Sequence, residues 1–266
     1  MITHFHRTYV DCAFGQLHVT TDGGKVDGRQ PLVLLNSRPR SLLKLLDPLR
    51  GQFYSVIIDI PGLGMSSPMP AGSSMWDAAA SMVRAFDVLA IGRAHLFGLH
   101  TGAKVAAAVA AKYPDRIERL VLAGKSHSIV ADRTARNLAM RNYLATGPLD
   151  STIVQMEGKY LDDNSQKLGG ESVYSANFEF DLAAAVMQIH ADTLVLEIES
   201  EEEGASIGRQ AAALAELMPS AKVVVCPQTD PTGLDMYIGA NRLAALLAGF
   251  LSDTHPEQLG DPDDVT

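Results

Sequence analysis

Short apolar runs alternate with longer segments of helical periodicity along most of the chain. Residues 32–36 (Leu-Val-Leu-Leu-Asn) and 54–59 (Tyr-Ser-Val-Ile-Ile-Asp) are continuous runs, as expected of strands buried on both faces. Residues 75–91 instead repeat apolar side chains at helical spacing. The same reasoning predicts further strands at 7–12, 15–20, 94–98, 118–123, 192–198 and 222–226, and further helices at 101–112, 205–217 and 236–251. This order predicts an α/β fold, with a mostly parallel eight-stranded sheet flanked by helices.

Residues 125–190 interrupt the alternation and are richer in polar side chains. They contain helical patterns at 133–145 and 182–189 and a turn-like stretch at 161–172. A long insertion between two core strands is usually a lid over a binding site. We therefore expect four parts: a first core part at 1–124, a helical lid at 125–190, a second core part at 191–252 and a tail at 253–266.

Composition and charge narrow the class of protein without naming its chemistry. The chain is 47% hydrophobic with a net charge of −9, and residues 253–266 hold five acids without a lysine or arginine. That tail is expected to be disordered. An acidic surface gives no reason to expect nucleic acid as a partner, and no apolar run is long enough to predict a membrane span. Because Cys12 and Cys226 are too few for a disulfide framework and no signal peptide is visible, we expect a cytoplasmic protein.

Residues 98–102 read Gly-Leu-His-Thr-Gly between a predicted strand and a predicted helix. A sharp strand-to-helix turn needs small residues on both sides, here Gly98 and Gly102, and holds its central residue out of the sheet. This segment resembles the nucleophile elbow of the α/β-hydrolase fold superfamily, and in particular a subgroup with a His-Thr-Gly elbow in place of Gly-x-Ser-x-Gly. Three further segments resemble the family in the same order, namely residues 31–41, 59–66 and 113–122.

The resemblance implies the hydrolase fold, but the catalytic residues depart from the family pattern. His100 stands where the family has Ser, Cys or Asp, and the loop at 226–235, which carries the family's histidine, contains none. Alignment of the penultimate strand places Glu201 at the acid position. The usual His-Gly of the oxyanion loop is Asn36-Ser37. Ser-His-Asp hydrolysis is therefore not expected.

His100 has two interpretations of similar weight. Imidazole acts as a base or nucleophile near neutral pH, and the N-terminus of the following helix favours its neutral form. By analogy with the family, the N–H groups of Thr101 and Arg38 would hold an oxyanion. Alternatively, the histidine only fills the space left by a lost serine, and the protein is catalytically silent.

The remaining candidates depend on the same site. Glu201 or Asp230 could orient the imidazole of His100, although an acidic run is more often a solvated loop. Arg38 could bind a substrate carboxylate, and Ser37, Asn36 and His127 border the expected pocket. His18 and His95 are interpreted as structural.

No group of residues has the spacing of metal ligands, and no phosphate loop or dinucleotide motif is present, so no cofactor is expected. Two functions remain open. One is an enzyme acting on a small organic molecule, by ester or lactone hydrolysis or by proton abstraction as in a lyase or cyclase. The other is a catalytically silent homologue that binds a small ligand or a protein partner. The apolar final helix suits core packing or a homodimer contact.

Overall fold

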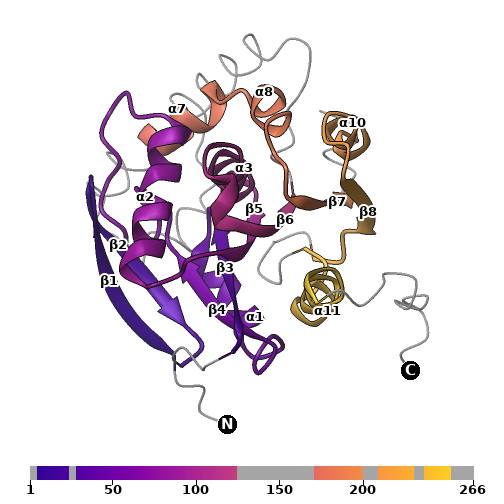
Figure 1. Ribbon diagram of the computed structural model, residues 1–266, viewed down its shortest axis with the longest axis horizontal. Coiled ribbons are helices and arrows are strands. Elements are labelled where there is room, and N and C mark those ends of the chain that lie inside the picture. The colour runs from indigo at the N-terminus through magenta and orange to yellow at the C-terminus, as the bar shows by residue number, and fades with distance from the viewer. Residues whose placement is uncertain (1–4, 24–27, 125–170, 200–208, 231–236, 253–266) are drawn as a thin grey trace.

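The computed structural model describes residues 5–23, 28–124, 171–199, 209–230 and 237–252. Their core is one sheet of eight strands in the order β1-β2-β4-β3-β5-β6-β7-β8 (Figure 1). The first two strands form an antiparallel hairpin and the other six are parallel to one another. The strands are β1 (His6–Cys12), β2 (Gly15–Thr21), β3 (Gln30–Asn36), β4 (Phe53–Ile58), β5 (Ala94–Leu99), β6 (Ile117–Ala123), β7 (Asp192–Glu199) and β8 (Ala221–Pro227).

Helices cover both faces of the sheet, as Figure 1 shows. One apolar cluster packs beneath α2 (Met75–Val88), α3 (Thr101–Lys112), α7 (Glu171–Glu179), α8 (Leu182–Val186) and α10 (Ala211–Glu216). A second packs beneath α1 (Leu43–Leu46) and α11 (Ala240–Leu251). Two 3-10 turns, η1 (Pro39–Leu42) and η2 (Pro114–Arg116), complete the described elements. This arrangement confirms the predicted fold class.

Two of the inner strands, β4 and β5, are buried along their whole length, which explains their mostly apolar sequences. Every residue of β4 and of β5 is buried. Strand β3 lies between them and pairs in parallel with both, so that Asn36 is opposite Leu99, and Leu99 is opposite Ala123 of β6. The carboxyl ends of β3, β5 and β6 therefore meet at one edge of the sheet, where sites lie in folds of this kind.

Four predicted helices have other bounds than the sequence pattern indicates, among them 182–189, where α8 ends at Val186. In the predicted helix 205–217, residues 205–208 lie outside the described residues, and α10 starts at Ala211, because the carboxylate of Glu197 in β7 accepts the N–H groups of Gln210 and Ala211, both at 3.1 Å. In 236–251, α11 starts at Ala240, after Gly239 with φ of 84°. In 75–91, α2 ends at Val88, and the chain turns at Ala90 with φ of 53°.

Part of the segment predicted to be a lid packs against the core. The turn-like pattern at 161–172 is wrong at its end, because residues 171 and 172 already belong to α7. Phe180, which follows α7, makes an edge-on contact with Trp76 of α2, with ring centroids 5.3 Å apart. In α3, Lys104 donates from its buried ammonium group to the carbonyl oxygen of Asn177 at 2.7 Å. The helix predicted at 133–145 lies outside the described residues, and the four-part boundaries stay a prediction.

No helix among the described residues is long and apolar enough to cross a membrane.

Candidate active site

The elbow segment forms the predicted turn between β5 and α3, with His100 at its tip. The backbone of His100 has φ of 55° and ψ of −121°, a combination that residues with a Cβ rarely adopt. Its N–H donates to the carbonyl oxygen of Ala123 at 3.1 Å, and its own carbonyl oxygen accepts from the N–H of Ala103 at 2.9 Å. Such strain persists only where the surrounding structure enforces it, and it clusters at functional sites.

The two glycines of the elbow are required by contact with backbone atoms. A Cβ on Gly98 would lie 2.3 Å from the carbonyl oxygen of Gly102. A Cβ on Gly102 would lie 2.2 Å from the carbonyl oxygen of Leu35 in β3. Helix α3 therefore packs against β5 and β3 at a distance that only glycine permits, as the sequence predicted.

The imidazole of His100 is partly buried between two neighbouring chain segments. A Cβ on Gly124 would lie 2.8 Å from its Nδ1 atom, so only a glycine fits beside the ring at the end of β6. The ring of Tyr237 is also in contact, with its centroid 4.9 Å away at an interplanar angle of 84°. The imidazole thus contacts backbone at the end of β6 and an aromatic side chain from the segment before α11.

The loop after β3 is organised by the amide of Asn36. Its Nδ2 atom donates to the hydroxyl of Ser41 at 2.9 Å and to the carbonyl oxygen of Arg38 at 3.2 Å. Its Oδ1 atom accepts from the hydroxyl of Ser37 at 3.3 Å. Asn36 is buried, whereas Ser37 and Arg38 are partly exposed beside the elbow. Asn36 therefore shapes the loop on which Ser37 and Arg38 are carried.

The glycine-rich loop at 59–66 is fixed to the opening hairpin through a buried carboxylate. Asp59 lies 3.0 Å from Nδ1 of His18 and accepts from the N–H of Met65 at 2.9 Å. Gly64, with φ of 59°, passes so close that a Cβ would lie 2.8 Å from Pro39 in η1. The loop consequently braces the segment after β3, and His18 has a structural partner.

Residues after β8 approach the elbow through a closed turn. The carbonyl oxygen of Tyr237 accepts from the N–H of Thr229 at 2.6 Å and from the N–H of Asp230 at 2.9 Å. Asp230 is partly exposed in this turn. Its pairing with His100 stays a prediction, as do the oxyanion roles of Thr101 and Arg38. Thr101 is buried at the start of α3. Glu201 and His127 lie outside the described residues.

Tyr237 was placed in the final helix by the sequence pattern, and this assignment is wrong. The residue precedes α11 and has φ of 67°. The sequence showed that Tyr237 follows the last predicted strand. It was assigned to the helix because Tyr237 and the apolar residues after it repeat at helical spacing.

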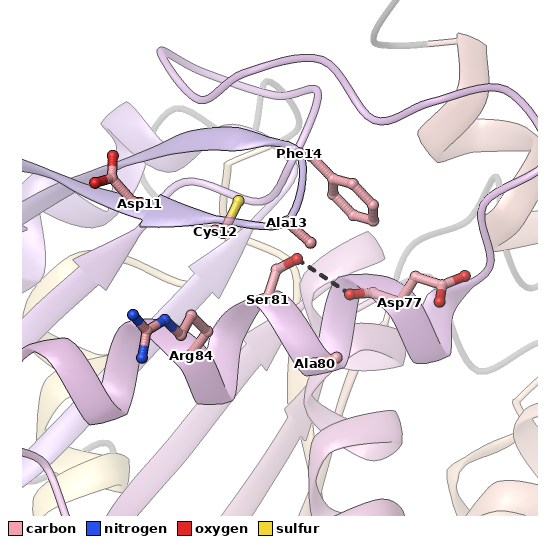
Figure 2. Close-up of a pocket in the computed structure, with 8 residues that line it drawn as sticks. All are labelled: Asp11, Cys12, Ala13, Phe14, Asp77, Ala80, Ser81 and Arg84. Carbon is pink, nitrogen blue, oxygen red and sulfur yellow. Dashed lines mark hydrogen bonds between the residues drawn. The ribbon is translucent and has the colours of Figure 1, made fainter.

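Figure 2 shows a separate hollow of about 500 Å³ between the opening hairpin and α2. It is lined by Asp11, Cys12, Ala13, Phe14, Asp77, Ala80, Ser81 and Arg84, none of which is a predicted site residue. The hydroxyl of Ser81 donates to the carbonyl oxygen of Asp77 at 3.1 Å, one turn earlier in the same helix.

The described His, Cys, Asp and Glu side chains form no cluster able to hold a metal ion.

Comparison with known proteins agrees with this architecture. A family model described as the alpha/beta hydrolase fold matches residues 30–146. The enol-lactonase from Burkholderia xenovorans LB400 superposes with a TM-score of 0.68 at 19% identity, over 92% of this chain and 100% of that one. The E-2-(acetamidomethylene)succinate hydrolase gives a TM-score of 0.71 at 20% identity, over 94% and 100%. The chain therefore has the α/β-hydrolase fold. No finding bears on the His-Thr-Gly subgroup, which stays a prediction.

Curated relatives match only segments of the chain. A 2-hydroxy-6-oxononadienedioate/2-hydroxy-6-oxononatrienedioate hydrolase of Burkholderia vietnamiensis is 40% identical over 105 residues, which are 36% of each protein. The dihydrolipoyllysine-residue acetyltransferase component of the acetoin cleaving system of Cupriavidus necator is 38% identical over 77 residues, or 29% of this chain and 21% of that protein. The matches span about a fifth to two fifths of the relatives' lengths.

Proposed function

We propose that this chain is an enzyme acting on a small organic molecule, with His100 as the base at the elbow. The observation that carries the proposal is the strained backbone of His100, with φ of 55° and ψ of −121°. Holding a non-glycine residue in such a conformation costs about 1–3 kcal/mol. The close packing of α3 on β5 and β3 enforces this conformation, and we infer that the strained turn is kept because it presents a reactive side chain.

The position of His100 suits a neutral imidazole. It precedes α3 directly, so the positive end of the helix dipole disfavours a second proton on the ring. A neutral imidazole near pH 7 can take a proton from water or from an acidic C–H bond. It could also attack a carbonyl carbon as a nucleophile.

For hydrolysis, His100 takes a proton from water while the water oxygen bonds to the carbonyl carbon of the substrate. The carbonyl electron pair moves to oxygen, where the N–H groups of Thr101 and Arg38 would hold it. When this pair returns, the bond to the leaving group breaks, and the imidazolium gives its proton to the leaving atom. Proton abstraction from carbon, as in a lyase or cyclase, needs only the first proton transfer and the same oxyanion contacts.

The names of the similar proteins suggest where to look for the substrate. Two are hydrolases of dioate or succinate compounds and one is an enol-lactonase. We therefore infer a carbonyl compound that bears a carboxylate, with Arg38 as the group that binds it. Residues 125–190 would cover the site as a lid.

A substrate screen of enol lactones, esters and oxo-dienoate acids, followed by ultraviolet absorbance, tests the proposal. Replacement of His100 by Ala should lower any turnover by about 100-fold to 10,000-fold, the range for loss of a general base. The control is His6→Ala, because His6 is exposed at the start of β1, which lies at the edge of the sheet. A serine-directed phosphonate should label neither protein. Turnover retained in His100→Ala, or phosphonate labelling at the elbow, contradicts the proposal.

The second candidate function is a catalytically silent homologue. It is favoured by the contact between His100 and Tyr237, since an aromatic side chain then occupies space beside the ring. In that case, no screened compound would be turned over, while a ligand or protein partner would still bind at the elbow and lose affinity in His100→Ala.

A further inference from the structure

Two residues with unusual backbone conformations contact each other at the elbow. Among the described residues, only Ala90, His100 and Tyr237 combine a side chain with a positive φ. Two of these three, His100 and Tyr237, are in ring contact although they are far apart in the sequence. Strain in both partners of one contact indicates that the contact itself is enforced.

The turn that carries Tyr237 fixes its backbone. The carbonyl oxygen of Tyr237 accepts from the N–H groups of Thr229 and Asp230, and also from the hydroxyl of Thr229 at 3.2 Å. The next residue, Ile238, is buried with 2% of its surface exposed, and Gly239 then turns the chain into α11. The tyrosine ring is thereby held over the elbow by its hydrogen-bonded turn and by a buried anchor.

Backbone also contacts the imidazole. Gly124 has φ of 81°, and the space for its Cβ is taken by Nδ1 of His100 and by Leu99. The N–H of Gly124 donates to the carbonyl oxygen of Leu196 in β7 at 3.4 Å. The backbone of Gly124 and the ring of Tyr237 therefore both restrict the space in which the imidazole can rotate.

We propose that Tyr237 is a positioning residue, which holds the imidazole of His100 in one orientation at the elbow. This inference rests on the proposed function, in which His100 is the base. A base needs a defined direction for proton transfer, and in a Ser-His-Asp triad a carboxylate supplies that restraint. In this chain the aromatic ring and Gly124 supply it by contact.

The test follows the ring of His100 by proton–carbon NMR in the full chain, with the signal assigned by its loss in His100→Asn. In the wild type, the ring proton should be displaced from the free-histidine position by the aromatic current of Tyr237. Tyr237→Phe should keep this displacement and a single sharp signal. In Tyr237→Leu, the displacement should disappear, the signal should broaden, and the midpoint of the pH titration of the His100 ring should shift. The matched control, Tyr9→Leu, makes the same substitution at an exposed tyrosine of β1 and should leave all three unchanged.

Two results overturn the inference. One is a wild-type signal at the free-histidine position, which does not depend on Tyr237→Leu and so holds even if that variant does not fold. The other is a displacement, line width and pH midpoint that are the same in Tyr237→Leu as in the wild type. Neither readout requires turnover. Failure of the substrate screen with a displaced ring signal rejects the proposed reaction alone, whereas turnover with an unaffected signal rejects the positioning role alone.

Discussion

Two histidines five positions apart in the sequence have opposite surroundings. His95 is buried within β5, with 4% of its surface exposed, and its ring meets Phe53 edge-on at a centroid distance of 5.8 Å. His100 stands at the tip of the same strand and is partly exposed. Burial, with a smaller effect from the positive charge of Arg119, lowers the pKa of His95 to about 4. His95 is therefore neutral in the folded protein at neutral pH, in keeping with a structural role.

The lowered pKa of His95 makes stability depend on pH. The unfolded chain takes up a proton below about pH 6.5, while the folded chain resists it until about pH 4. The contribution of neutral His95 to the free energy of unfolding is thus fully present above pH 6.5. It is lost as the pH drops towards 4, by about 3 kcal/mol. In His95→Gln, urea unfolding at pH 7 and pH 4.5 should show a correspondingly smaller loss. Equal losses in the variant and the wild type would contradict the prediction.

At the scale of elements, the elbow depends on how closely α3 approaches the sheet. Gly102 contacts the backbone of β3, and this neighbour is a strand in the middle of the sheet that cannot move aside. The contact also fixes the loop after β3 relative to His100. A single methyl group at this point would disturb the helix, the strand and the loop together.

Gly102→Ala should therefore destabilise the protein by about 3 kcal/mol or more, at the upper end of the cost of overpacking. The matched control is Gly92→Ala, because nothing lies within 4 Å of a Cβ at that position and its φ is not positive. Thermal or urea unfolding of both variants checks the prediction. A stability of Gly102→Ala close to that of Gly92→Ala would show that the close approach is not rigid.

The sequence predicted those elements whose signal is local. The buried strands appear as apolar runs, and the elbow appears because Gly98 and Gly102 are spaced for a sharp turn. The start of α10 could not be predicted, since its cap is the carboxylate of Glu197 on a different element. The contact of Tyr237 with His100 was missed for the same reason. Contacts between distant segments depend on the assembled sheet and leave no periodic pattern in either segment.

At the scale of the whole molecule, the C-terminal helix is joined to the sheet through Arg119. From β6, the guanidinium of Arg119 donates to the carbonyl oxygen of Phe250 in α11 at 2.8 Å and lies 5.8 Å from the centre of the Phe250 ring. This carbonyl belongs to the last turn of α11, where it has no later N–H within the helix to bind. The contact thus satisfies the end of the helix and ties it to the sheet.

Arg119→Met should loosen α11 selectively. A hydrogen bond to a charged group contributes about 1.5–3 kcal/mol, and its loss falls on the element that it holds. Amide hydrogen exchange should become faster in α11 while the rates in α3 change less. The control Arg84→Met, at an exposed position on α2, should leave exchange in α11 unchanged. Uniform acceleration across both helices would indicate global rather than local destabilisation.

The parts of the candidate site are distributed unevenly along the chain. The loop after β3, the elbow and Gly124 all come from residues 36–124, while Tyr237 follows the last strand. Because a chain is synthesised from its N-terminus, the ribosome releases the histidine-bearing turn long before the aromatic residue that faces it. The nascent protein therefore lacks the contact between His100 and Tyr237 until β8 and the segment after it have been made, and under the proposed role of Tyr237 the imidazole is oriented only from then on.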